Sequence, residues 1–204
     1  MKTLICLLSA TTLWSVTLVK DGKSEYSICL EAQPSAADRH AAGELQRFIE
    51  EMSGARLPLT DSCDVRQPHI YVGAHPGLAG LTSDSFGPEE FVLKTAGSHI
   101  VVAGGRPRGT LYGVYTLLDR LGCRWYTADV GRIPKRSTLE IATLDERGRP
   151  AFEYREPYFT EALDKDWAAR NRTNGAFSRL DESTGGKVEY YPFVHSFYSL
   201  LPPD

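Results

Sequence analysis

The stretch from Val101 to Thr127, VVAGGRPRGTLYGVYTLLDRLGCRWYT, most constrains the fold of this chain. Its apolar run, glycine-rich turn, periodic apolar segment and second apolar run predict strand, turn, helix and strand in that order. Apolar residues recur at three- and four-residue spacing in the helical part, and Gly122 follows as a C-terminal stop. We therefore expect a helix with one face against a β-sheet.

The glycine-rich turn also raises a functional question, because phosphate-binding loops join a strand to a helix. Gly104 and Gly109 have the spacing of such a loop. The next two residues are threonine and leucine, where the motif needs lysine and serine or threonine, and the dinucleotide pattern GxGxxG is absent. We interpret the turn as structural, and Arg106 or Arg108 remains a candidate to reach a ligand or a neighbouring domain.

A second amphipathic helix is expected from Ser35, a capping residue, to Gly54, a stop. We expect both helices on the same side of a sheet whose strands cover residues 14–20, 25–30, 56–60, 69–73, 91–95, 99–103, 123–127 and 138–142. The first two strands should pair as a hairpin around Asp21-Gly22. Residues 91–95 and 99–103 should form a second hairpin.

The net charge argues against one class of partner, and the N-terminal residues indicate where the protein is sent. The 204-residue chain has a net charge of −3, which argues against a nucleic-acid surface. Residues 1–14 combine a basic start, an apolar run and small residues, as a secretory signal does, and the run is too short to span a bilayer. We expect secretion or periplasmic export, with a first β-strand as the alternative.

Cysteine and histidine spacing gives no metal or cofactor motif. Of four cysteines, three remain if the leader is removed, so a complete disulfide framework is not expected. Cys29 and Cys123 lie in apolar contexts typical of core cysteines. There is no CxxC, and the five histidines include no HExxH pair, which disfavours a zinc hydrolase.

The chain changes character near Gly148-Arg149-Pro150, where we expect a domain boundary. Beyond it we expect a strand from Ala151 to Glu156, a short helix from Asp164 to Asn171 and a strand from Tyr190 to Phe193. Such a short, aromatic-rich segment cannot easily build its own core. We therefore expect it to begin a second domain, and the chain to be a fragment of something larger.

Several segments together carry a family resemblance: ADRHAAGELQRFIEEMSGARLPL, HIYVG, GGRPRGTLYGVYTLLDRLGCRWYT and PAFEYRE. Over roughly residues 15 to 204 the chain resembles the N-terminal part of bacterial glycosidase-like proteins that carry domain of unknown function 4838. Their N-terminal domain is similar to the second domain of β-hexosaminidases and to the N-terminal domain of α-glucuronidases. The resemblance implies an α+β fold, a mixed β-sheet with two helices packed on one face in a zincin-like topology.

The resemblance also implies that a (β/α)8 barrel follows this domain. The expected organisation is a signal peptide at residues 1–14, an accessory domain at 15–148, and the beginning of a truncated catalytic barrel at 149–204. Barrel active sites lie at the C-terminal ends of the strands. On that basis Arg155 and Glu156 would lie at the mouth and His195 on a loop over the same face, where all three would touch the carbohydrate.

Catalysis by glycoside hydrolases usually needs two carboxyl groups. The resemblance places that pair downstream of Asp204, so we expect the 204-residue chain alone to be inactive. Within the chain, Glu153 should pair with Arg155 on one strand face, and Asp164 should cap a short helix. No cofactor or metal is expected.

Aromatic residues are abundant in the second half of the chain and could stack on sugar rings. We expect most of them to fill the interface between the accessory domain and the barrel: Trp125, Tyr126, Tyr158, Phe159, Trp167, Tyr190, Tyr191, Phe193, Phe197 and Tyr198. The leading hypothesis is an accessory domain of a carbohydrate-active enzyme, without nucleic-acid partners or a membrane span. The alternative is a non-catalytic carbohydrate-binding or surface-interaction protein.

Overall fold

The computed structural model describes residues 15–75, 77, 80–189 and 196–201. Its main helices are α1 (Ala36–Ser53), α3 (Gly109–Leu121), α4 (Lys165–Arg170) and α5 (Phe197–Leu200). The strands are β1 (Ser15–Val19), β2 (Ser27–Leu30), β3 (Leu59–Thr60), β4 (His69–Val72), β5 (Phe91–Ala96), β6 (His99–Gly104), β7 (Arg124–Trp125), β8 (Gly131–Arg132), β9 (Leu139–Ala142) and β10 (Asp145–Gly148). Within the described part of the chain, no helix is long and apolar enough to cross a membrane.

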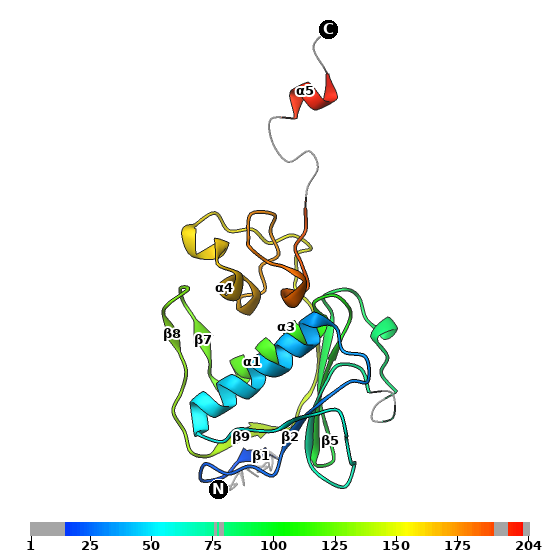
Figure 1. The fold of residues 1–204 in the computed structure, drawn as a ribbon, viewed down its shortest axis with the longest axis vertical. Coiled ribbons are helices and arrows are strands. Elements are labelled where there is room, and N and C mark those ends of the chain that lie inside the picture. The colour runs from blue at the N-terminus through cyan, green and yellow to red at the C-terminus, as the bar shows by residue number, and fades with distance from the viewer. Residues whose placement is uncertain (1–14, 76, 78–79, 190–195, 202–204) are drawn as a thin grey trace, which may run out of the picture.

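Six strands form one mixed sheet in the order β10-β5-β6-β4-β2-β3. β3, β2, β4 and β6 run parallel to one another, whereas β5 and β10 are antiparallel to their neighbours. Helices α1 and α3 lie side by side on one face of this sheet (Figure 1). The expected α+β fold, with a mixed sheet and two helices on one face, is therefore confirmed.

Helix α1 begins and ends where the sequence predicts. The Ser35 hydroxyl accepts a hydrogen bond from the Asp38 amide, and the Asp38 carboxylate accepts one from the Ser35 amide, which completes a capping box. Gly54 ends the helix in the left-handed conformation. The apolar stripe, which includes Leu45, Phe48 and Ile49, is buried against the sheet and α3.

The glycine-rich turn packs backbone against backbone. A Cβ atom on Gly104 or Gly109 would lie against the carbonyl oxygen of Glu90, and one on Gly105 would lie against Gly87. Only glycine allows this approach. The turn is thus a close connection that seats α3 on β5 and β6, as the sequence predicts.

The prediction that β1 and β2 pair as a hairpin around Asp21-Gly22 is wrong. The turn is present, with both residues at positive φ, and Lys20 and Lys23 form an isolated bridge. β1 continues away from β2, however, and pairs with β9. Both edges of β2 are already occupied by the parallel strands β3 and β4, so β2 has no free edge for β1.

Around the proposed domain boundary the structure adds one strand and removes another. Residues 145–148, directly before the proposed boundary, form β10, which was not expected and which adds to the edge of the main sheet beside β5. The strand expected from Ala151 to Glu156 is absent, because the backbone of Arg155 bonds residue 174 instead of a neighbouring strand. The strand expected at 190–193 lies outside the described residues.

The segment from 151 to 189 packs against α1 and α3. Its short helix α4 begins after Asp164, whose carboxylate accepts the Trp167 amide as predicted. Among the aromatics expected at an interface, Trp125 and Trp167 are buried. Tyr126, Tyr158, Phe159 and Phe197 are exposed in this chain. Whether such rings fill an interface with a barrel stays a prediction.

Candidate functional site

Glu89, two residues before β5, is the centre of a hydrogen-bonded cluster. Its Oε1 accepts hydrogen bonds from Arg108 Nε at 2.9 Å, Arg155 Nη2 at 2.8 Å and Asn174 Nδ2 at 2.9 Å. Its Oε2 accepts one from Arg155 Nη1 at 2.9 Å. One carboxylate therefore joins the glycine-rich turn to two points of the segment from 151 to 189.

The electrostatics of the cluster keep Glu89 ionised. Burial alone would raise the pKa of this carboxyl, but the hydrogen bonds and charges of Arg155 and Arg108 outweigh it and lower the pKa below 4.5. The Tyr112 hydroxyl lies 3.4 Å from Oε1, and burial followed by the Glu89 charge raises the pKa of Tyr112 to about 12. Glu89 is thus a poor proton donor at neutral pH.

Arg155 binds residues of the first 148 positions rather than the Glu153 carboxylate. The predicted ion pair with Glu153 is wrong, since Arg155 contacts only the backbone oxygen of Glu153 and places its guanidinium on Glu89 and on the Tyr112 hydroxyl at 3.1 Å. The Arg155 amide donates to Asn174 Oδ1 at 2.9 Å, and the Asn174 amide donates to the Arg155 carbonyl at 3.1 Å. Arg155 fastens its segment to the first 148 residues.

Glu156 follows Arg155 but has other partners. Its Oε1 accepts the Phe177 amide at 2.6 Å, and its Oε2 accepts the hydroxyls of Tyr154 and Tyr158. A Cβ atom on Gly175 would overlap the Glu156 side chain, so the two residues are in close contact. Arg155 and Glu156 line one small cavity of about 10 Å³, which is too small for a sugar ring. His195 lies outside the described residues.

A second buried ion pair joins α4 to α1. Arg170 Nε lies 2.8 Å from Glu44 Oε2, and both side chains are less than a tenth exposed. The Tyr115 hydroxyl donates to the same oxygen at 3.4 Å, and burial raises the pKa of Tyr115 well above 10. The Arg170 guanidinium also lies 5.3 Å from the centre of the Phe48 ring, within cation–π range.

A third contact lies beyond the end of α4. Arg172, in the left-handed conformation with a φ of 58°, forms an ion pair with Asp119 and donates to the Thr116 hydroxyl at 3.3 Å. The Asn171 side chain donates to the Trp125 carbonyl at 3.2 Å. Arg155, Arg170 and Arg172 thus bind carboxylates of the first 148 residues at three separate places.

These arginine–carboxylate pairs were not predicted from the sequence. No motif or spacing in the sequence marks Glu44 or Glu89 as a partner of an arginine. Arg108, which the sequence offers as a candidate to reach a ligand or a neighbouring domain, donates from its Nη1 to the Gly185 carbonyl at 3.0 Å. Arg106 instead binds Glu31 at 2.7 Å.

An open cleft of about 480 Å³ lies beside the Glu89 cluster and is lined by Arg108, Arg149, Phe152 and Glu153, among others. Phe152 is exposed. Glu89 already accepts four hydrogen bonds from arginine and asparagine side chains, which leaves it little capacity to act as a base. Glu90, which also lines the cleft, is paired with Arg147 at 2.7 Å. Two of the carboxylates that line the cleft are therefore already bound to arginines.

The three described cysteines form one disulfide and leave one thiol free. Cys29 and Cys63 form a disulfide, and Cys123 is a buried free thiol. Cys123 lies in the core as expected, and burial raises its pKa to about 12. Cys29 is buried too, but on the opposite face of the sheet and bonded to Cys63.

The fold of this chain is similar to that of N-terminal domains of glycoside hydrolases. Residues 18–117 match the family model described as the glycosyl hydrolase family 67 N-terminus. No curated protein gives a significant match.

Solved structures show the same fold at low sequence identity. A family GH115 4-O-methyl-α-glucuronidase with specificity for decorated arabinogalactans is similar at a TM-score of 0.58 and 17% identity, over 84% of this chain and 29% of that one. The GH20 β-N-acetylhexosaminidase from Streptomyces coelicolor A3(2) is similar at 0.52 and 16%, over 78% and 31%. The chain thus spans less than a third of the length of these enzymes.

Proposed function

We propose that this chain is the N-terminal part of a secreted, glycoside-hydrolase-like protein, in which residues 15–148 form an accessory domain. In this proposal the segment after 148 begins a (β/α)8 barrel that hydrolyses glycosidic bonds. The observation that carries the proposal is the bidentate hydrogen bond from Arg155 to Glu89 across the proposed domain boundary. The match to a glycoside hydrolase N-terminus and the length of the similar enzymes support it.

The accessory domain would hold the barrel rather than perform chemistry. Buried charges are costly unless they are paired in good geometry, so each pair favours one orientation of the two segments. Three arginines between 155 and 172 are paired in this way with Glu89, Glu44 and Asp119. These pairs would fix the first residues of the barrel against the accessory domain.

The disulfide supports the export that we propose for this protein. Disulfides persist in secreted and periplasmic proteins and are rare in the reducing cytosol. The Cys29–Cys63 bond therefore agrees with a leader at residues 1–14. The leader itself lies outside the described residues.

A carbohydrate-binding module is the second candidate function, and one observation favours it. Tyr158 and Phe177 are both exposed, with ring centres 6.0 Å apart, and exposed aromatic rings can stack on sugars. In this alternative the chain would bind saccharides without help from a barrel.

Two assays on the 204-residue chain separate these functions. For the accessory domain we expect no hydrolysis of aryl glycosides above a heat-inactivated control, and no heat of binding with N-acetylglucosamine or glucuronic acid oligomers. Saccharide binding that Tyr158→Ala abolishes would favour the binding module. Hydrolysis by this chain alone would contradict the proposal.

A further inference from the structure

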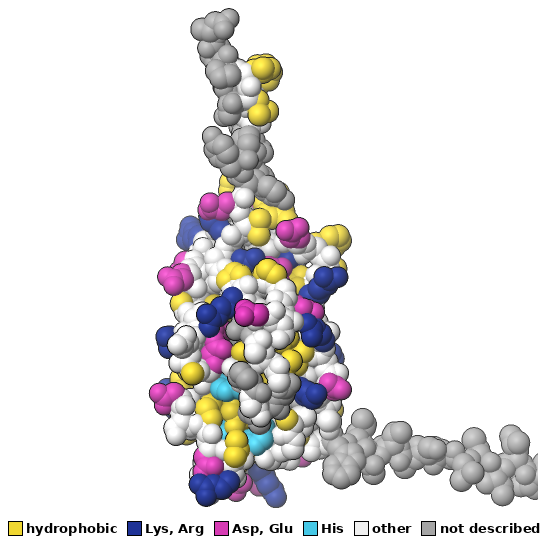
Figure 2. All heavy atoms as spheres, turned by 90° about the vertical axis from the view of Figure 1, so that its right-hand side faces the viewer, with side chains coloured by type: hydrophobic (Ala, Val, Ile, Leu, Met, Phe, Trp, Pro, Cys, Tyr) yellow, Lys and Arg dark blue, Asp and Glu magenta, His cyan; other side chains and the backbone are white. Residues whose placement is uncertain are grey.

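The face of the sheet opposite α1 and α3 carries a separate cluster of chemically reactive side chains. Figure 2 shows this face, where histidine side chains lie among hydrophobic ones. Cys29 on β2, Cys63 in the loop before β4 and His75 in the loop after β4 come together there. None of them takes part in the contacts that hold the segment from 151 to 189.

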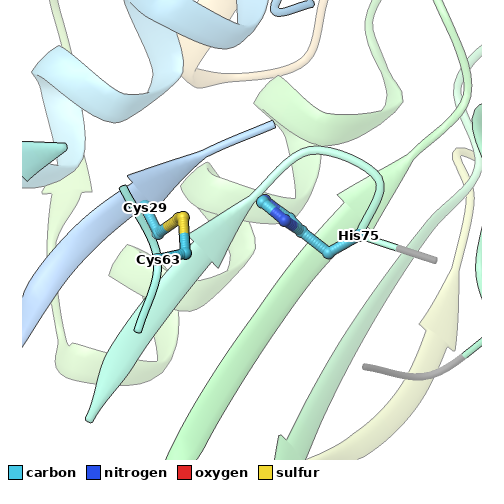
Figure 3. A group of neighbouring side chains, drawn as sticks. All are labelled: Cys29, Cys63 and His75. Atoms are coloured by element: carbon cyan, nitrogen blue, oxygen red, sulfur yellow. A yellow bond between two sulfur atoms is a disulfide. The ribbon is translucent and has the colours of Figure 1, made fainter. Parts of the chain in front are cut away.

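Three potential metal ligands meet at this place. The two sulfur atoms and one ring nitrogen of His75 all lie within 4.8 Å of one another. Figure 3 shows the His75 ring turned toward the sulfur atoms. Cys29 is buried, whereas Cys63 and His75 are partly exposed, so the site is lined by protein but open to small solutes.

His75 has an unused ring nitrogen. Its Nε2 is buried and has no hydrogen-bond partner among the described residues. Buried polar groups usually have a partner, so an orphan of this kind needs an explanation. An imidazole nitrogen is the commonest metal ligand in proteins, so a bound cation would satisfy this atom.

The turn that positions His75 is fixed by the fold. Gly73 has a φ of 99°, and a Cβ there would overlap the Glu31 side chain. The Glu31 carboxylate accepts the Ala74 amide at 2.9 Å and binds Arg106 at 2.7 Å. The His75 ring packs edge-on against Tyr71, with ring centres 4.6 Å apart.

We propose that Cys29, Cys63 and His75 form a redox-controlled site for a thiophilic cation of the Zn²⁺ class, closed as a disulfide and open as a dithiol. A dithiol reductant supplies two electrons and two protons, which break the S–S bond and leave two thiols. Binding of the cation then releases both thiol protons and forms two metal–sulfur bonds and one metal–nitrogen bond. A water molecule would complete four-coordination.

The separation of Cys29, Cys63 and His75 fits both the disulfide and the metal-bound dithiol. The Cα atoms of Cys29 and Cys63 are 5.9 Å apart, within the usual range for a disulfide of about 4.4–6.8 Å. In a tetrahedral zinc site with Zn–S bonds of about 2.3 Å, two sulfurs lie about 3.8 Å apart and a sulfur and a nitrogen about 3.5 Å. Those separations are within the 4.8 Å that the three ligand atoms already span. Small side-chain rotations would therefore convert one state into the other.

Zinc titration of the full chain tests the proposal. The protein is reduced, freed of reductant under nitrogen and titrated with Zn²⁺ against a chromophoric chelator, beside an oxidised sample. We expect one Zn²⁺ per reduced chain and none per oxidised chain. With Co²⁺ in place of Zn²⁺, a thiolate-to-cobalt charge-transfer band should appear only in the reduced sample.

Three variants assign the ligands. His75→Ala should weaken Zn²⁺ binding at least 10-fold, and Cys63→Ser should remove the charge-transfer band. Cys123→Ser should behave as the wild type, because the pKa of about 12 keeps that buried thiol protonated. Equal Zn²⁺ binding by the reduced and oxidised proteins, or by His75→Ala and the wild type, would overturn the proposal. Circular dichroism of each variant confirms that it is folded.

Discussion

The guanidinium of Arg155 binds both oxygens of Glu89, with Nη1 2.9 Å from Oε2 and Nη2 2.8 Å from Oε1. The two residues are 66 positions apart and lie on opposite sides of the expected domain boundary. Both side chains are mostly buried, at 16% and 14% exposure. Loss of either partner therefore leaves the other charge poorly solvated.

Arg155→Met should destabilise the protein by about 3 kcal/mol. The mostly buried Glu89 carboxylate would lose its bidentate hydrogen bonds to the guanidinium. Equilibrium unfolding in urea, followed by circular dichroism, measures the change. Arg120→Met is the matched control, since Arg120 pairs with Glu146 at the surface and should contribute no more than about 1 kcal/mol. If the two substitutions lower the free energy of unfolding equally, the claim that burial makes the Arg155–Glu89 pair more stabilising than a surface pair is wrong.

Stability should fall in acid partly because of Glu89. Folding lowers the pKa of this carboxyl, so the unfolded chain binds its proton more tightly and a fall in pH favours unfolding. The stabilisation is complete above the ordinary value of 4.5 and is lost as the pH falls through the lower folded value. Urea midpoints measured between pH 7 and pH 3 should therefore fall less steeply for Glu89→Gln than for the wild type. Glu25→Gln, at an exposed position, should keep the wild-type slope.

The pair of Glu44 and Arg170 should show strong coupling. Either single substitution to methionine leaves one buried charge, and each should cost about 3 kcal/mol. The double variant should be closer to the wild type than the sum of the single variants, by about 1–3 kcal/mol. A double-mutant cycle in urea measures this difference, and additive effects would show that the two side chains act independently.

Two glycines should respond in opposite ways to alanine. Gly109→Ala would place a methyl group against the Glu90 carbonyl and should destabilise the protein. Gly43, inside α1, has no atom within 4 Å of a built Cβ, so Gly43→Ala should stabilise it by up to about 1 kcal/mol. Thermal unfolding of both variants tests the packing of the glycine-rich turn. A stabilising Gly109→Ala would mean that the turn is looser than the structure has it.

The sequence predicts the local elements well and the long-range pairings less well. Ser35 and Gly54 bound α1, and Gly122 ends α3, because capping depends on nearby residues alone. The partner of β1 could not be predicted, because β9 follows it by more than a hundred residues. A turn at Asp21-Gly22 favours a hairpin locally, but the parallel neighbours of β2 exclude it.

The candidate site was predicted only in part. Arg155 is important in the structure, but for its bond to Glu89, which no periodicity could reveal. Glu44 borders the apolar stripe of α1, four residues before Phe48, and this position was the available sign that it is covered. The approach of Cys29, Cys63 and His75 also depends on three separate segments, which is why ligand spacing along the chain gave no metal motif.

Hydrogen exchange tests most directly the claim that the segment after 148 is fixed to the accessory domain. The amides of Ala168, Asn171 and Thr173 are hydrogen-bonded around α4. If the arginine pairs hold this segment, these amides should exchange as slowly as those of α3, through unfolding of the whole molecule. Complete exchange of the α4 amides while α3 remains protected would show that the segment opens by itself, and would contradict this account.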